Sequence, residues 1–133
     1  NFLKKKKKKI AKKYRFYLNK NKQIFFSKNF LNTKSSYWLY YIKLKEKISF
    51  ARDKIIDHLL KNGIEARNGF YPAHLMDPYK KFSSKKNNLD NSIKLSKSII
   101  ALPSSVNLED KEIKDICENL NIVLKKFDND KRL

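Results

Sequence analysis

The sequence passes from a helix to a strand and then to an aromatic loop within twelve residues, Gly63-Ile64-Glu65-Ala66-Arg67-Asn68-Gly69-Phe70-Tyr71-Pro72-Ala73-His74. The pair Asn62-Gly63 is a helix-ending signal, because glycine takes the left-handed position after the last turn. Ile64 supplies the apolar contact that usually follows such a cap. We therefore predict a strand at residues 64–68 that leaves the helix cap directly.

Residues 69–82 differ in kind from the rest of the chain, because they combine aromatic and aliphatic side chains with two prolines. Pro72 and Pro78 are expected to exclude regular structure. An apolar loop of this length is unusual unless it lines a pocket or an interface. We expect the candidate site here, followed by a polar hinge or crossover at residues 83–88.

The region upstream of this stretch predicts a helix, a short strand, a long strand and a second helix. Residues 3–18 have helical spacing, with lysines on the solvated face and an inward stripe of Leu3, Ile10, Tyr14, Tyr17 and Leu18. A short strand at 23–27 and a polar loop at 28–36 follow. Residues 37–44 are apolar on both alternating faces, which predicts a strand buried on both sides.

The second helix is expected at residues 50–61. Ser49 is its predicted N-cap, since a serine oxygen accepts a hydrogen bond from the first turn. The predicted inward residues of this helix are Ile55, Ile56, Leu59 and Leu60.

Downstream, the sequence predicts a helix at 89–97, a strand at 98–102 that Pro103 ends, and a long last helix. Asn107 is the predicted N-cap of the last helix, whose acidic residues lie at its start and whose lysines lie at its end. Its predicted buried stripe is Ile113, Ile116, Cys117, Leu120 and Leu124. The tail from Asp128, including residues 128–133, is expected to be frayed.

These elements indicate one α+β domain, which is also what 133 residues allow. We predict a two-layer small domain with a mainly antiparallel three-stranded sheet of residues 37–44, 64–68 and 98–102. Helices cover one face of the sheet, and those at 50–62 and 108–126 are expected on the same face.

The formal net charge of +19 comes almost entirely from lysine, with 28 Lys against 4 Arg. Nucleic-acid readers usually rely on arginine for bidentate contacts. A Lys, Asn and Ile excess also arises from an AT-rich genome, so we favour a compositional origin. A lysine-rich nucleic-acid-binding module remains the alternative function.

No apolar run approaches the roughly 20 residues of a membrane span. The single Cys117 fits a reducing, cytoplasmic compartment.

Six segments of the chain, taken in order over residues 3–126, resemble the C-terminal domain of the DegT/DnrJ/StrS aminotransferases. They are Ile10-Ala11-Lys12-Lys13-Tyr14, Tyr37-Trp38-Leu39-Tyr40, Arg52-Asp53, Gly63-Ile64, Arg67 with Tyr71-Pro72-Ala73-His74, and Ala101-Leu102-Pro103-Ser104. The resemblance implies that residues 1–133 form the small domain of a larger fold type I enzyme, in which residues 1–20 are the connecting helix. Within the family, Trp38 and Phe70-Tyr71-Pro72 are most similar to enzymes that aminate C4 of a GDP-linked 4-keto-6-deoxy sugar, the perosamine synthases.

The resemblance also implies a reaction, a cofactor and partners. Family members move an amino group from glutamate to a nucleotide-linked keto sugar, use pyridoxal phosphate (PLP) and are expected to be homodimers. The Schiff-base lysine and the other cofactor-binding residues belong to the family's large domain, so we expect no catalytic or cofactor-binding residue here and an inactive isolated chain. A stand-alone interaction domain is a third possibility.

Four residues are the candidate substrate-binding residues. Arg67 is expected to pair with a carboxylate or phosphate, and His74 to donate a hydrogen bond to sugar or phosphate. Tyr71 and Trp38 are expected to stack on the apolar face of a sugar. For each of them a structural role stays open: an ion pair for Arg67, a packing role for the others.

Overall fold

The structure, a computed structural model, describes residues 2–82 and 89–129 of the chain. The helices are α1 (Phe2–Leu18), α2 (Arg52–Lys61), α3 (Asp77–Lys80), α4 (Asp90–Ser98) and α5 (Asp110–Asn129), with 3-10 helices η1 (Glu46–Ala51) and η2 (Ala73–Leu75). The strands are β1 (Ile24–Phe26), β2 (Tyr40–Leu44), β3 (Arg67–Asn68) and β4 (Ile99–Leu102).

The four strands form one antiparallel sheet in the order β1-β2-β4-β3. Ile42 lies opposite both Phe26 and Ile100, which fixes the register of the central pair. The predicted antiparallel α+β class is confirmed. The sheet has four strands instead of three, because the short strand that we placed at 23–27 pairs along β2 as β1.

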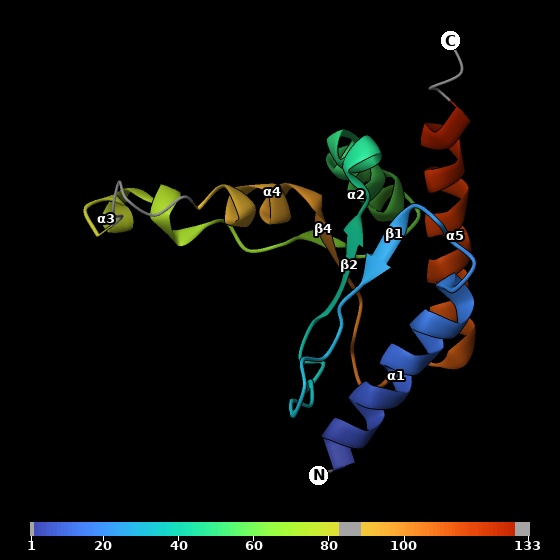
Figure 1. The fold of residues 1–133 in the computed structure, drawn as a ribbon. Coiled ribbons are helices and arrows are strands. Elements are labelled where there is room, and N and C mark those ends of the chain that lie inside the picture. Colours follow the sequence, from blue (N-terminus) through green and yellow to red (C-terminus); the bar gives the residue numbers. More distant parts are fainter. Residues whose placement is uncertain (1, 83–88, 130–133) are drawn as a thin grey trace.

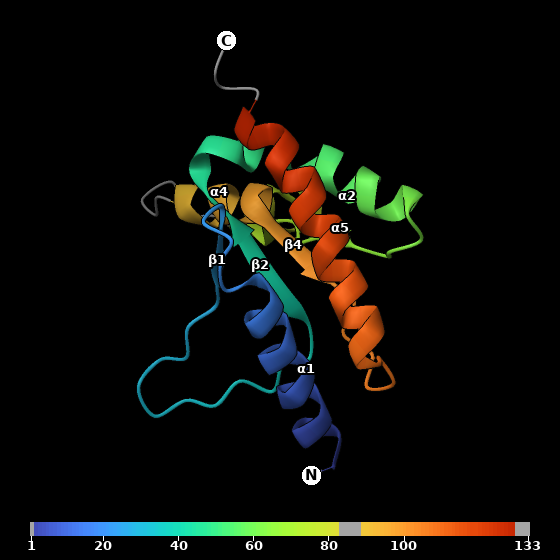
Figure 2. The same cartoon turned by 90° about the vertical axis from the view of Figure 1, so that its right-hand side faces the viewer.

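One face of the sheet is covered by α1, α2 and α5. Figure 2 shows α1 and α5 in front of the sheet, and α5 also packs against α2. The side chains that point toward these helices are fully or almost fully buried: Tyr40, Ile42, Leu44, Ile100 and Leu102. The predicted placement of the second and last helices on the same face is therefore confirmed.

The prediction that residues 37–44 form a strand buried on both sides is wrong in two respects. The strand begins at Tyr40, and its burial alternates, with Lys43 exposed and Tyr41 half-buried on the second face. Helices α1, α2 and α5 cover one face of this sheet, and Tyr41 and Lys43 on the other face keep contact with solvent. Trp38 lies outside the strand.

Tyr14 joins α1 to the sheet. Its ring stacks on Tyr40 at a centroid distance of 4.7 Å, and its hydroxyl donates a 2.7 Å hydrogen bond to the carbonyl of Pro103. Burial raises the pKa of Tyr14 well above its ordinary value, so the hydroxyl remains a donor. Ile10 and Leu18 are buried as predicted, whereas Leu3 is exposed.

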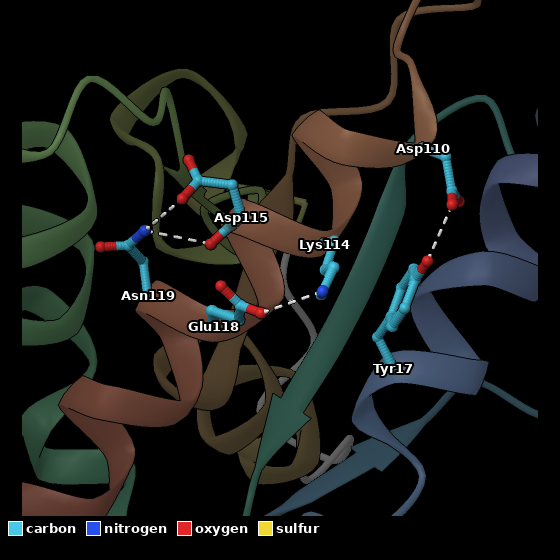
Figure 3. A network of polar contacts seen from close by, with 6 residues as sticks. All are labelled: Tyr17, Asp110, Lys114, Asp115, Glu118 and Asn119. Atoms are coloured by element: carbon cyan, nitrogen blue, oxygen red, sulfur yellow. Dashed lines mark hydrogen bonds and ion pairs between the residues drawn. The ribbon is translucent and has the colours of Figure 1, made fainter.

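A polar contact joins α1 to the start of α5 at the surface. Asp110 accepts a 2.9 Å hydrogen bond from the Tyr17 hydroxyl and lies 2.7 Å from the Lys13 ammonium. These two partners lower the pKa of the Asp110 carboxyl. Figure 3 shows the Tyr17–Asp110 contact beside two pairs within α5, Lys114–Glu118 and Asp115–Asn119. Part of the lysine charge is thus paired inside the domain.

For helix α2, the sequence predicts the C-terminal end correctly but not the N-terminal cap. Ser49 is not its N-cap, because residues 46–51 form η1 and the Ser49 hydroxyl donates to the Glu46 carbonyl. At the other end, Gly63 has φ +75°, Gly63 N donates to Leu60 O and Ile64 N donates to Leu59 O. This is the predicted glycine cap. Leu60 is exposed, contrary to prediction.

Helix α5 begins at Asp110, two residues later than an Asn107 cap requires. Glu109 takes the cap position instead, because its carbonyl accepts from Ile113 N and its own N–H donates 2.7 Å to the Glu112 carboxylate. The predicted buried stripe is confirmed, and burial raises the pKa of Cys117 to about 12. The helix continues to Asn129, and the fraying expected at residues 128–133 stays a prediction. Residues 130–133 lie outside the described residues.

Residues 69–82 and 89–98 form an arm that projects from the sheet on the side away from α5 (Figure 1). The prolines do not exclude regular structure here: η2 follows Pro72, and Pro78 lies in the first turn of α3, where a missing N–H costs nothing.

Helix α4 begins and ends one residue later than predicted. Strand β3 is limited to two residues, since Ala66 N bonds back to Ile64 O. The hinge predicted at 83–88 lies outside the described residues.

The joint at Tyr14 makes a paired prediction. Tyr14→Phe should lower the free energy of unfolding by about 1–3 kcal/mol, because the Pro103 carbonyl loses its donor while the stacked ring remains. Tyr40→Phe is the matched control, since the buried Tyr40 hydroxyl has no hydrogen-bond partner among the described residues. Its removal should cost little or nothing. Urea unfolding of the two variants measures the difference, and equal losses would contradict the role given to the Pro103 bond.

Candidate functional site

A pocket of about 520 Å³ lies where the arm leaves the body of the domain. Three parts of the chain form it: the start of α2, the end of β3 with the segment that follows it, and the last two turns of α4. Its lining residues are Arg52, Asn68, Gly69, Tyr71, Pro72, Leu75, Ile93, Ser96 and Lys97. We call this the loop pocket. It combines an apolar wall with two cationic side chains.

Arg52 fixes the relation between α2 and α4 at the loop pocket. Its Nη1 donates a 2.6 Å hydrogen bond to the Ser96 carbonyl, and its Nε donates 2.8 Å to the Asp53 carboxylate. A cation in the first turn of a helix is unfavourable with respect to the helix dipole, so these partners are needed to hold it there. The guanidinium therefore remains at the pocket wall, with its charge partly balanced by Asp53.

Gly69 allows the loop to pass close over β4. A Cβ atom at this position would lie 2.1 Å from Cδ1 and 2.2 Å from Cγ1 of Ile99. A contact that short is not tolerated by real side chains, so Ile99 occupies the space that a side chain at 69 would need. The absence of a side chain thus brings the following aromatic residues next to the sheet.

Two of the four predicted site residues, Tyr71 and Trp38, lie in or beside this loop with their aromatic rings exposed. Tyr71 lines the loop pocket and is 58% exposed. Trp38 stacks on Phe70 at a centroid distance of 6.3 Å and an interplanar angle of 25°, and both rings are 68% exposed. Trp38 comes from the segment before β2, so the stack joins two parts of the chain that are 32 residues apart.

Arg67 and His74 do not line the loop pocket. Arg67 is exposed in β3 and forms an ion pair with Glu65, which raises the pKa of the Arg67 guanidinium. His74 lies in η2, half-buried, and its buried Nε2 has no hydrogen-bond partner among the described residues. The structure therefore brings Trp38 and Tyr71 to one loop but does not gather all four residues around one cavity.

Arg52, Asn68 and Lys97 are wall residues that sequence reasoning missed. One signal was available for Arg52, because an arginine at the first position of a helix opposes the dipole and needs a specific partner. Asn68 and Lys97 carry no such signal, since only the packing of the arm brings them to the pocket. Within residues 2–82 and 89–129, no three His, Cys, Asp or Glu side chains gather as a metal ion would require.

None of the helices formed by the described residues is both long and apolar enough to cross a membrane.

The model of the DegT/DnrJ/EryC1/StrS aminotransferase family matches residues 1–121 of this chain. Two curated relatives are GDP-perosamine synthases. The one from Vibrio cholerae is 37% identical over 86 residues, which are 62% of this chain and 22% of that protein. The one from Caulobacter vibrioides is 44% identical over 43 residues, which are 32% of this chain and 12% of that protein. The matched regions thus span less than a quarter of these relatives.

A solved structure shows the same fold over nearly the whole chain. Spr1654 from Streptococcus pneumoniae, described as a sugar aminotransferase and solved in its PLP form, has a TM-score of 0.80 with 25% identity. The similarity covers 93% of this chain and 32% of that one. The arrangement of helices and strands described above is therefore that of about one third of a longer protein.

The close approach at Gly69 leads to a prediction for the loop. Gly69→Ala should lower the free energy of unfolding by about 1–3 kcal/mol, because the new methyl group forces Ile99 or the loop to move. Ile99→Ala removes the obstructing atoms, so the double variant should lose less than the sum of the two single losses. Urea unfolding of the four proteins measures the coupling. Additive losses would mean that the contact with Ile99 is not what requires glycine.

Proposed function

The chain belongs to the DegT/DnrJ/EryC1/StrS aminotransferase family, and we propose that it forms the substrate-side, C-terminal domain of a sugar aminotransferase. In this proposal the enzyme moves an amino group from glutamate to a nucleotide-linked keto sugar. The exposed Trp38–Phe70 stack beside Tyr71 is the observation that supports this most directly. Aromatic rings left outside a core are typical of surfaces that contact a ligand or another domain.

The proposed acceptor is a GDP-linked 4-keto-6-deoxymannose, aminated at C4. Support for this finer assignment comes from the two relatives described as GDP-perosamine synthases. Aromatic side chains stack on the apolar face of a sugar, which is the role proposed for Trp38 and Tyr71. Arg67 is proposed to pair with a carboxylate of glutamate or a phosphate of the nucleotide, in exchange for Glu65.

The proposed cofactor is PLP, which supplies the electron sink for amino transfer when it is bound. The loop pocket does not fit this group. Lys97 is on its wall, but the lining includes neither Asp nor Glu to pair with a pyridine nitrogen. We therefore propose that residues outside this chain hold the cofactor and that this chain alone is inactive. A homodimer in the cytoplasm, without nucleic-acid or membrane partners, completes the proposal.

Arg67→Ala and His74→Ala test the site in the enzyme that joins this domain to its large domain. Each substitution should raise the KM for glutamate or the sugar nucleotide and leave the cofactor absorbance band unchanged. Loss of one charge-assisted hydrogen bond costs about 1.5–3 kcal/mol, which is roughly ten- to a hundredfold in kcat/KM. Lys61→Ala, an exposed charge change at the end of α2, is the control. If both variants fold, dimerise and turn over both substrates like wild type, the two residues are structural.

The lysine charge leads to a separate prediction about nucleic acids. Titration of labelled RNA and DNA at about 150 mM salt should give weak binding without sequence preference. Non-specific affinities at physiological salt are about 10⁻⁴ to 10⁻⁶ M, and part of the charge is paired with Asp110. Sub-micromolar binding with a clear sequence preference would instead favour the lysine-rich nucleic-acid-binding module.

A further inference from the structure

We propose that Lys7 of α1 is a positioning residue for the Trp38–Phe70 stack and that it acts through the backbone carbonyl of Trp38. The stack would then move with α1, the helix that precedes the rest of the domain. This inference rests on the proposed function only for its kinetic consequence. The positioning of Trp38 by Lys7 is independent of that function and follows from the contacts described below.

The Lys7 ammonium bridges two segments that lie far apart in the sequence. Its Nζ donates a 3.0 Å hydrogen bond to the Trp38 carbonyl. It also donates to the Ser104 carbonyl and, at 3.3 Å, to the Ser104 hydroxyl. The Ser104 hydroxyl lies 3.4 Å from the same Trp38 carbonyl. One cation therefore holds Trp38, two residues before β2, and Ser104, the residue that follows Pro103.

The backbone that presents Trp38 needs such a restraint. Tyr37, immediately before it, has φ +52°, in the left-handed region that a bulky side chain rarely adopts. Two contacts among the described residues support this turn: a 3.1 Å hydrogen bond from Tyr37 N to the Ser35 hydroxyl, and the packing of the half-buried Tyr37 side chain against the core. Strained backbone of this kind persists where neighbouring contacts enforce it. The Lys7 contacts supply that enforcement on the carbonyl side of Trp38.

Burial does not hold the two rings. Trp38 and Phe70 are both 68% exposed, so the hydrophobic effect contributes little to their orientation. The stack joins the Trp38 ring to the ring of Phe70, which is itself exposed on the loop. The orientation of Trp38 therefore depends on its main chain, and Lys7 is the side chain that bonds to that main chain from α1.

Helix α1 does not depend on Lys7 for its own place. Ile10, Tyr14 and Leu18 anchor the helix in the core, and Tyr14 bonds to the Pro103 carbonyl independently. Loss of the Lys7 ammonium should thus leave the fold intact while releasing Trp38. Lys8, in the same run, is exposed and provides a matched control.

Trp38 is the only tryptophan of the chain, so its fluorescence reports on this position alone. Lys7→Met in the 133-residue chain should at least double the amplitude of the sub-nanosecond anisotropy decay of Trp38, as Phe70→Ala should. Lys8→Met should leave it unchanged. Lys7→Arg should also preserve the wild-type decay, because a guanidinium can donate to both carbonyls. Far-UV circular dichroism checks that each variant keeps its helices.

A wild-type anisotropy decay in a folded Lys7→Met chain would overturn the proposal. If that variant does not fold, the unaltered chain still decides: the Lys7 ammonium protons should exchange with water several-fold more slowly than those of Lys8 in nitrogen-detected NMR, and equal rates would overturn it.

The enzyme that joins this domain to its large domain provides the kinetic readout. Lys7→Met should raise the KM for the keto sugar several-fold and leave kcat unchanged, with Lys8→Met as control. An unchanged KM together with a freed Trp38 would count against the sugar-stacking function but not against the positioning by Lys7.

Discussion

The hydrogen bond from Tyr14 to the Pro103 carbonyl, with the Tyr14–Tyr40 stack beside it, is the contact on which the domain is organised. It joins the first helix to the two central strands at the point where both strands end or begin. Strand β4 ends at Leu102, so the Pro103 carbonyl lies beyond the sheet ladder, and Tyr14 is its donor. The helix layer and the sheet thereby meet at one defined place, and α5 closes over the joint.

The core and the arm of this domain are stabilised differently. The body buries one continuous apolar cluster beneath α1, α2 and α5. Within the described part of the arm, only Pro72 and Ser98 are buried. Its shape depends on the Arg52–Ser96 bond, on the space above Ile99 and on short helical turns. The residues proposed to contact substrate lie on or beside this arm, where local contacts and not core packing set the geometry.

The sequence predicted elements whose cause is local and failed where a distant segment decides. The glycine cap at Gly63 and the stripe of α5 follow from neighbouring residues, and both were predicted. Ser49 and Asn107 were wrong caps, because η1 and the Glu109–Glu112 pair occupy those positions. The exposure of Lys43 depends on which face the helices cover. The Arg52 wall and the Trp38–Phe70 stack need the packing of the arm, which no pattern in the chain encodes.

The six-lysine run before Ile10 has a consequence for how this gene tolerates small changes in length. Lys7 lies three residues before Ile10, and every residue from 4 to 9 is lysine. Insertion or deletion of one lysine codon in the run still leaves a lysine at that distance from Ile10. The change rotates only what precedes the run, by about 100° around the helix axis, and Phe2 and Leu3 there are exposed. Repetitive coding tracts are ordinarily sites of slippage. Here the gain or loss of one codon leaves the lysine that contacts the Trp38 carbonyl in place.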